Sequence, residues 1–280
     1  MRWPPGPAGP DPVPVPGALD ATLVLVRHGE STWIAEGRFQ GRQNPPLSPL
    51  GERQARLVAA RLAQRDDQTP LPIPVGQPTG IWHSPLNRAA QTARAIAEAQ
   101  PTTMPLIIAD GLTEIAQGEW EGRPQAEVRT HWAAELSAWR RTPVTSHAPG
   151  GESLAEAAER VSRALGDVFA SLVRKNTRTT PTRRDPVPGY ATAAGATPSD
   201  DPWAVLVAHD GIFRIVLLTL LDLPIERFWS FPFNLCAITV VVTQEGLAAL
   251  RAHNLSEHLA PLTAEARAAA EARGDRRGAL

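Results

Sequence analysis

Two histidines in this sequence directly follow runs of apolar residues, and both could act on an anionic group. The run LVLV ends in Arg27 and His28, and the run AVLVA ends in His209. A third apolar segment, IWH, precedes SPLNR, which places Arg88 in the first turn of a predicted helix. Guanidinium groups and imidazoles gathered at one place would bind a phosphoryl group, neutralise its oxygens and offer a nucleophile.

For these side chains to meet, the apolar runs must be strands of one sheet. Their length of four to eight residues and their content of Val, Leu and Ile favour buried strands. Two further runs near the end of the chain could form an antiparallel pair at one edge of the sheet. The predicted strands cover residues 21–26, 79–82, 203–208, 237–242 and 247–251.

Helix signals alternate with these strands. Ser48-Pro49 and Ser84-Pro85 each place an N-cap residue before a proline suited to the first helical position, and the second pair opens the helix that carries Arg88. After Glu152, apolar residues recur every three or four positions, which predicts an amphipathic helix. The predicted helices cover residues 48–65, 152–174 and 211–221, together with the one that begins at residue 84.

Alternating strands and helices predict an α/β fold with a mostly parallel central sheet and helices on both faces. In such a sheet ligands bind beyond the carboxyl ends of the strands. Arg27, His28, Arg88 and His209 would all lie at that edge. The sequence therefore predicts an anion site there.

Composition excludes several other classes of function. The chain has 280 residues, 42% of them hydrophobic, and a net charge of −1, so no overall field attracts nucleic acid or an acidic membrane surface. The longest strongly apolar run, residues 215–221, is far shorter than the ~20 residues that cross a bilayer. The single cysteine, Cys236, cannot form a disulfide within the chain. We expect a cytoplasmic protein that binds neither nucleic acid nor membranes.

Three low-complexity or terminal segments flank or interrupt the core. Residues 1–20 are rich in proline and are expected to form a disordered or extended tail. Residues 175–202 are rich in Thr, Pro, Gly and Ala and are expected to form a surface insertion within a domain of residues 21–258. Residues 259–280 are expected to form a C-terminal helix that frays into a charged tail.

Paired histidines also suggest a metal site, with Glu30 and Asp210 as further ligands. The neighbouring arginines would repel a divalent cation, and the sequence has no HxxxH or HxH cluster. We therefore expect no metal.

A series of motifs makes the prediction more specific. The motifs, in chain order, are LVRHGEST, RFQG, LSPLGERQA, SPLNRAAQTA, LTEIAQGEWEG, PGGES and VAHDG. In content and order this series resembles the histidine phosphatase superfamily, in its phosphoglycerate-mutase-like group. The series spans residues 23–214, and the segment that follows, to about His258, also fits. The resemblance implies a single phosphoglycerate-mutase-like α/β domain.

The resemblance also implies a role for each matching residue. His28 would attack phosphorus and become a phosphohistidine. Arg27, Arg88 and His209 would hold the phosphoryl oxygens, with His209 a catalytic residue. Glu114 would be the general acid and base, which requires a raised pKa. The positions that line the substrate side in relatives are Ser31, Gln40 and Gly41. No metal or organic cofactor is implied.

Three positions depart from the pattern of the superfamily. Ile34 stands where relatives usually carry an asparagine that helps to bind phosphate. Asp210 stands where glycine is common, and we expect its carboxylate to point away from the phosphate. His83 stands where serine is frequent, and it adds a polar contact or is a harmless substitution. These changes bear on rate and substrate choice.

Three functions remain open at this point. A phosphatase acting on a small phosphomonoester is favoured because the stretch between Glu114 and the PGGES motif is short, whereas classical mutases carry longer covering segments. A mutase stays possible because residues 175–202 could cover the site as a lid. The third hypothesis is a non-catalytic protein that binds a phosphorylated ligand. Neither the substrate nor the oligomeric state follows from the sequence.

Overall fold

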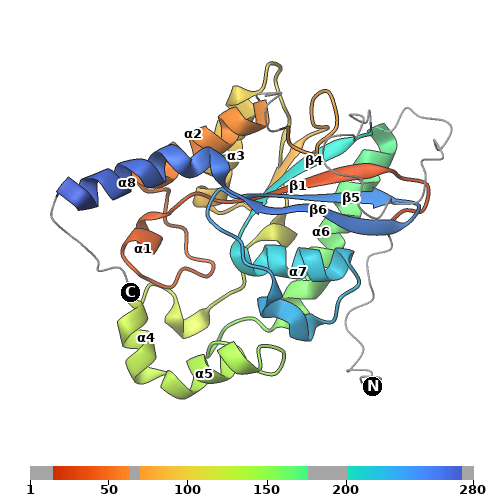
Figure 1. Ribbon diagram of the computed structural model, residues 1–280. Coiled ribbons are helices and arrows are strands. Elements are labelled where there is room, and N and C mark those ends of the chain that lie inside the picture. The colour runs from red at the N-terminus through yellow and green to blue at the C-terminus, as the bar shows by residue number, and fades with distance from the viewer. Residues whose placement is uncertain (1–14, 64–69, 176–200, 273–280) are drawn as a thin grey trace, which may run out of the picture.

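A six-stranded sheet in the order β3-β2-β4-β1-β5-β6 forms the centre of the computed structural model (Figure 1). The structure describes residues 15–63, 70–175 and 201–272. Strand β4 pairs in parallel with β1 and β2, and β2 with β3, whereas β5 and β6 join as antiparallel strands. The strands are β1 (Ala21–Arg27), β2 (Ile81–His83), β3 (Leu106–Ile108), β4 (Trp203–Ala208), β5 (Ile238–Gln244) and β6 (Leu247–Leu255).

Helices cover both faces of this sheet, which confirms the predicted fold class (Figure 1). Helices α2 and α3 lie on one face, and α6 and α7 lie on the other. Helix α8 runs beside α2, to which an ion pair between Arg53 and Glu265 joins it. The helices in chain order are α1 (Thr32–Ala35), α2 (Pro49–Ala63), α3 (Asn87–Ala99), α4 (Gln125–His131), α5 (Ala133–Arg141), α6 (Leu154–Lys175), α7 (Asp210–Leu220) and α8 (Ala260–Ala272). Short 3-10 turns occupy Asp110–Leu112, Gly118–Trp120, Ile225–Ser230 and Glu257–Leu259.

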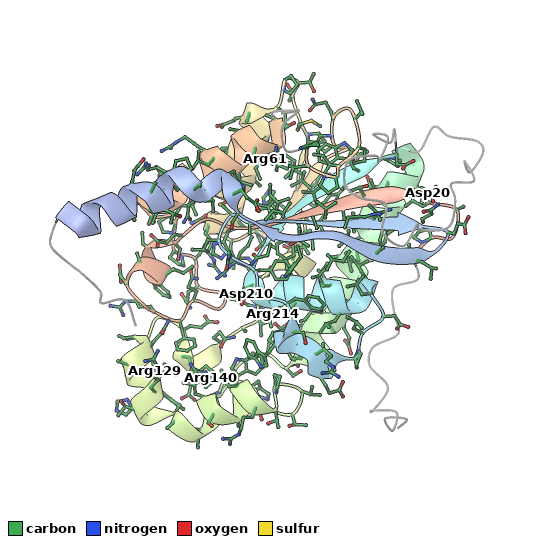
Figure 2. All side chains as sticks on the ribbon, viewed as in Figure 1. Asp20, Arg61, Arg129, Arg140, Asp210 and Arg214 are labelled. Atoms are coloured by element: carbon green, nitrogen blue, oxygen red, sulfur yellow. The ribbon has the colours of Figure 1, made fainter. Side chains whose placement is uncertain are left out.

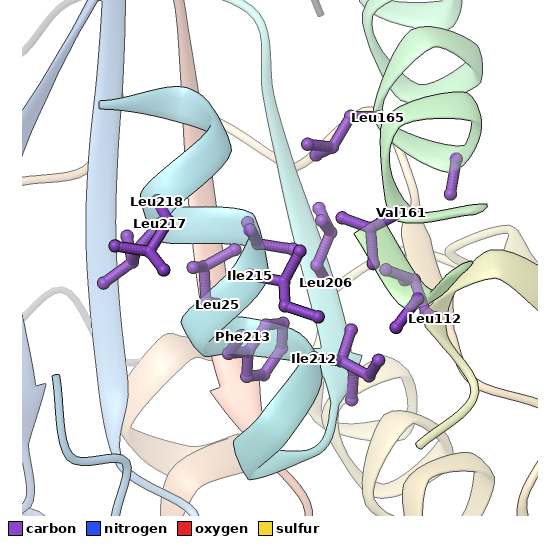
Figure 3. Close-up of a cluster of buried hydrophobic side chains, with 14 of the residues drawn as sticks. Leu25, Leu112, Val161, Leu165, Leu206, Ile212, Phe213, Ile215, Leu217 and Leu218 are labelled. Atoms are coloured by element: carbon purple, nitrogen blue, oxygen red, sulfur yellow. The ribbon is translucent and has the colours of Figure 1, made fainter. Parts of the chain in front are cut away.

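The alternation of side chains along β1 explains why both faces are covered. Leu23 and Leu25 belong to the core cluster under α6 and α7, whereas Val24 and Val26 pack with α2 and α3. Figure 3 shows the first cluster, in which Leu25 lies near side chains of α7. A strand that is apolar on both faces must be buried between two layers of helices, as β1 is.

Helix α6 forms as its apolar period predicts. Its residues Val161, Leu165, Val168 and Leu172 are fully buried. At its start, the backbone N–H of Glu156 donates to Oγ of Ser153, and the Glu156 carboxylate accepts from the backbone N–H of Ser153. This capping box satisfies two donors at the helix start.

The described chain begins with a short segment that packs against the sheet. Residues 15–20 are ordered, and Leu19 is only 1% exposed. The hydroxyl of Thr243 on β5 donates to the carbonyl of Leu19 at 3.3 Å. The buried leucine and this hydrogen bond fix the segment in spite of its prolines. Residues 1–14 and most of the predicted insertion, residues 176–200, lie outside the described residues.

A second difference concerns Ser84, which was predicted to cap the helix that carries Arg88. Helix α3 begins two residues later than expected, with Leu86 at the N-cap and no side-chain cap. The hydroxyl of Ser84 instead lies 2.8 Å from Nε2 of His209. Strand β3 and helices α4 and α5 were not predicted at all. Among the described residues, no helix has the length and apolar character needed to cross a membrane.

Candidate active site

The carboxyl ends of three parallel strands bring the predicted residues together. Arg27 ends β1 and His28 follows it, His209 directly follows β4, and Ser84 follows β2. The strand register aligns these ends, because the backbone N–H of His28 donates to Ala208 and that of Ser84 donates to Val207, both at 3.0 Å.

His28 is buried, and its hydrogen bonds define its tautomer. Nε of Arg88, which can only donate, lies 3.3 Å from Nε2 of His28. Nε2 is therefore the unprotonated nitrogen, and Nδ1 donates to the carbonyl of Gly29 at 2.6 Å. Burial, then the positive charges of Arg88 and Arg27, hold the pKa of His28 well below its ordinary value. The imidazole is therefore neutral at pH 7, and the lone pair of Nε2 points toward Nε of Arg88.

Arg88 in the first turn of α3 is fully buried, and no carboxylate of the described residues pairs with it. Its Nη1 and Nη2 donate to the carbonyls of Gln43 and Gly41 at 2.8 and 2.9 Å. Burial lowers the pKa of Arg88 to about 10, so the guanidinium stays charged at neutral pH. Arg88 therefore fixes the loop of residues 41–43 beside His28 and keeps a positive charge there.

Gly41 is needed in this loop for two reasons. Its φ is +50°, a conformation that L side chains rarely adopt, and a Cβ atom there would lie 2.1 Å from Oε1 of Glu121. The same Glu121 oxygen accepts from the backbone N–H of Arg42 at 2.9 Å. Any larger residue at position 41 would displace the carbonyl that Arg88 holds.

Arg27 adds a second cation to the site. Its Nη1 donates to the carbonyl of Phe233 at 2.5 Å, and its Nε is buried without a hydrogen-bond partner in the described part of the chain. A guanidinium with a buried donor to spare suits an anionic ligand.

His209 lies beside His28, with ring centroids 5.0 Å apart and the rings at 61°. It is fully buried, and burial, followed by the charge of Arg88, lowers the pKa of its imidazole well below the ordinary value. Its Nε2 contacts Ser84, whereas its Nδ1 is buried and has no hydrogen-bond partner among the described residues. One nitrogen of His209 is thus held and the other is free for a ligand.

Glu114 lies in the segment that follows the 3-10 turn Asp110–Leu112, and it is partly buried. Its Oε1 accepts from the backbone N–H of Ile115 at 2.9 Å. Burial raises the pKa of the Glu114 carboxyl, and the nearby charge of Asp210 adds to the rise. A raised pKa favours the protonated carboxyl, which is the form that a general acid needs.

Ser31 and Gln40 form a hydrogen bond with each other. Oγ of Ser31 donates to Oε1 of Gln40 at 2.5 Å and accepts from the backbone N–H of Ile34 at 3.1 Å, which caps α1. Gly41 follows Gln40 and reaches the site through its carbonyl on Arg88. The pair therefore connects α1 to the loop that Arg88 holds.

A charged cluster of Arg42, Glu152 and Arg160, which the sequence did not identify, supports the Glu114 segment. Oε1 of Glu152 accepts from both Arg42 and Arg160 at 2.7 Å. Arg160 also donates to the carbonyls of Gly111, Thr113 and Glu114. No local pattern indicates this cluster, because Glu152 precedes α6 and Arg42 is 110 positions away in the chain.

Asp210 forms an ion pair with Arg214 one turn further along α7, with 3.1 Å between Oδ1 and Nη2 (Figure 2). Its carboxylate is thus directed along its own helix. Glu30 accepts at 2.7 Å from the hydroxyl of Ser48, the residue whose Oγ also caps α2. Both carboxylates considered as metal ligands therefore have structural partners. Within the described ranges, no three His, Cys, Asp or Glu side chains group as a metal site.

Comparison with known proteins gives matches over most of the chain. The family model described as the histidine phosphatase superfamily (branch 1) matches residues 23–177 and 188–256. Phosphoserine phosphatase 1 of Hydrogenobacter thermophilus is 30% identical over 244 residues, which cover 87% of this chain and 97% of that protein. A probable phosphoglycerate mutase, GpmB of an Enterobacter strain, is 38% identical over 152 residues, or 52% of this chain and 61% of that one.

Solved structures have the same architecture. A mycobacterial glucosyl-3-phosphoglycerate phosphatase in complex with VO3 superposes with a TM-score of 0.65 at 27% identity. The superposition covers 84% of this chain and 99% of that one.

Proposed function

Because the chain belongs to the histidine phosphatase superfamily, we propose that it hydrolyses a small phosphorylated metabolite without a metal ion, through a phosphohistidine on His28. The proposal assigns the chemistry to a catalytic domain of residues 21–258. Relatives named as phosphatases support the reaction class.

The state of His28 is the observation that carries the proposal. An imidazole attacks phosphorus only with an unprotonated nitrogen, and Nε2 is unprotonated because it accepts from Arg88. The bond from Nδ1 to the carbonyl of Gly29 prevents the ring from turning away.

In the first proposed step, Nε2 of His28 attacks phosphorus in line with the ester bond. A P–N bond forms while the bond from phosphorus to the leaving oxygen breaks. Arg27, Arg88 and His209 stabilise the charge on the equatorial oxygens. Protonated Glu114 gives its proton to the leaving oxygen, so the organic product departs as an alcohol.

In the second step, water attacks the phosphorus of the phosphohistidine. The Glu114 carboxylate takes a proton from the water, and the P–N bond breaks. Inorganic phosphate leaves, His28 returns to its neutral form, and Glu114 is protonated again. Ser31, Gln40 and Gly41 are proposed to shape the substrate side of the pocket through the loop that Arg88 holds.

A phosphatase is preferred to a mutase because the stretch between Glu114 and the PGGES motif is short, whereas classical mutases carry longer covering segments there. Coverage favours neither reaction, because a relative named as a phosphatase matches 87% of the chain and one named as a probable mutase matches 80%. Organic phosphates, including phosphoserine and phosphoglycerate derivatives, are the first substrates to test.

The experiment measures phosphate release from a panel of small phosphomonoesters in the presence of EDTA. Wild type is compared with His28→Ala and with His131→Ala, which changes an exposed histidine on α4. Rapid quenching with labelled substrate then traps the phosphoenzyme. We expect release and acid-labile labelling from wild type and His131→Ala, and neither from His28→Ala.

Each alternative gives a different result. Release by His28→Ala at the wild-type rate would overturn the assignment of the nucleophile. Labelling of His28 that is discharged by an added alcohol acceptor but not by water would identify a mutase. Binding of the panel compounds without labelling or release would identify a phospho-ligand binder.

A further inference from the structure

Ser84 and His209 form a buried pair, and the proposed mechanism uses His209 but gives Ser84 no role. Both residues are fully buried, and Oγ of Ser84 lies 2.8 Å from Nε2 of His209. They follow different strands, β2 and β4, and are 125 positions apart in the chain. The contact is therefore a product of the fold and not of local geometry.

The hydrogen bonds of Ser84 decide which atom donates in this pair. Oγ of Ser84 accepts from the backbone N–H of Leu86 at 3.3 Å. Among the described residues, the only acceptor within reach of the Ser84 hydroxyl proton is Nε2 of His209. A buried hydroxyl proton without an acceptor is unfavourable, so the hydroxyl donates to Nε2.

The proton of the neutral His209 ring must then reside on Nδ1. That nitrogen is buried and has no partner in the described part of the chain. A buried N–H without an acceptor is rare in folded proteins and indicates a place that a ligand fills. The ring of His28, whose Nε2 is the proposed nucleophile, lies 5.0 Å away between centroids.

We propose that Ser84 is a positioning residue that holds His209 as the Nδ1–H tautomer, so that Nδ1 donates a hydrogen bond to an oxygen of the transferring phosphoryl group. The two histidines then share one tautomer and use opposite nitrogens. His28 offers the lone pair of Nε2 for attack, and His209 offers the proton of Nδ1 for charge stabilisation. This inference rests on the proposed function for its catalytic consequence, whereas the tautomer itself is a property of the resting protein.

Loss of the Ser84 hydroxyl would free Nε2 of His209 to carry the proton. In that tautomer Nδ1 has a lone pair, which repels a phosphoryl oxygen. The ring would exchange between the two forms, and only one of them assists transfer. We expect about a five- to tenfold fall in the rate of phosphoenzyme formation, with a small change in KM, since ground-state binding rests mainly on the arginines.

The test is nitrogen-15 NMR of histidine-labelled protein without substrate. The His209 signals are assigned by their disappearance in His209→Asn. Wild type is expected to show a protonated Nδ1 and an unprotonated Nε2 for His209. Ser84→Ala is expected to give averaged nitrogen signals, and Ser84→Thr, which keeps the hydroxyl, is expected to restore the single tautomer and most of the rate.

Ser162→Ala serves as the matched control, because Oγ of Ser162 on α6 is buried without a hydrogen-bond partner in the described structure. It should leave both the spectrum and the rate unchanged. An Nε2–H tautomer in wild type, or the same tautomer in Ser84→Ala as in wild type, would overturn the inference while leaving the phosphatase proposal intact. Absence of a phosphoenzyme in wild type would instead overturn the proposed function and leave the tautomer measurable.

Discussion

Gly211 and Glu114 are so close that a Cβ atom on Gly211 would lie 2.8 Å from Oε1 of Glu114. Gly211 is the second residue of α7, directly behind Asp210, and the carboxylate of the proposed acid fills the space that its missing side chain leaves. The carboxylate of Glu114 can therefore occupy this position only because residue 211 has no side chain.

Gly211→Ala is expected to displace the carboxylate and lower kcat on an alkyl phosphate by about tenfold. The loss should be much smaller on p-nitrophenyl phosphate, because its leaving group departs without a proton. Steady-state kinetics on both substrates measure the difference. Gly166→Ala on α6 is the control, since a Cβ there meets nothing within 4 Å. Equal losses on both substrates would show that Gly211 does not act through the acid.

Arg88→Lys should lower kcat/KM by about a hundredfold. Lysine keeps the charge but cannot contact His28, Gly41 and Gln43 at once as the guanidinium does. Arg94→Lys, an exposed change on the same helix, should have no effect. Circular dichroism confirms that both variants fold. A loss for Arg88→Lys no larger than that for Arg94→Lys would contradict the proposed role.

The pH dependence of kcat/KM on alkyl phosphates should have a basic limb set by Glu114. The carboxyl must be protonated to assist the leaving oxygen, and burial raises its pKa. Activity therefore falls as pH rises through that raised pKa. Glu114→Gln cannot titrate and should give a lower profile without that limb. A basic limb that persists unchanged in the variant would assign it to another group.

Stability should fall when the pH drops below about 6.5. The folded state holds the pKa values of His28 and His209 well below 6.5, so below that pH the unfolded chain binds more protons. Their contribution is complete above the unfolded pKa and is lost as pH falls through the folded values. The raised pKa of Glu114 acts in the opposite sense, with stability lost as pH rises.

Urea unfolding of wild type and His209→Gln between about pH 5 and pH 8 isolates the histidine contribution. The midpoint should fall less on acidification in the variant than in wild type. The exposed change His131→Gln should keep the wild-type slope. Identical slopes in wild type and His209→Gln would mean that His209 is not held neutral by the fold.

Glu152→Gln should destabilise the protein by about 2 kcal/mol and lower kcat, because it leaves Arg42 and Arg160 without their shared carboxylate. Arg160 holds the carbonyl of Glu114, so the change reaches the proposed acid. Glu127→Gln removes one partner of the exposed Arg123–Glu127 pair and should cost less than about 0.5 kcal/mol. Urea midpoints and kcat for both variants give the comparison.

The sheet and the ends of its main strands could be predicted because each buried strand is a short, uninterrupted apolar run. The apolar runs before His28 and His209 predict strands. Because the two strands pair in parallel, their carboxyl ends lie at the same edge of the sheet. Strand β3 was missed because it has only three residues, and Ile108 is 64% exposed. Such a segment has too little pattern to distinguish it from a loop.

The positions of Arg27 and His28 could be predicted because each depends only on where a buried apolar strand ends. A contact that depends on a partner far along the chain could not be predicted. Ser84 followed by proline has the local signature of a helix cap, and the fold instead supplies His209 as its partner. No local pattern around Ser84 contains that information.

The place of β1 in the sheet has a consequence for how the protein is made. Thr22 on β1 pairs with Trp203 on one side and Val242 on the other, so β1 is joined to strands that lie far along the chain. Loops this long make the pairing slow and leave an apolar strand exposed during synthesis. His28 is therefore synthesised long before the strand that brings His209 beside it. The proposed site is assembled only when β4 and β5 pair with β1 and complete the sheet.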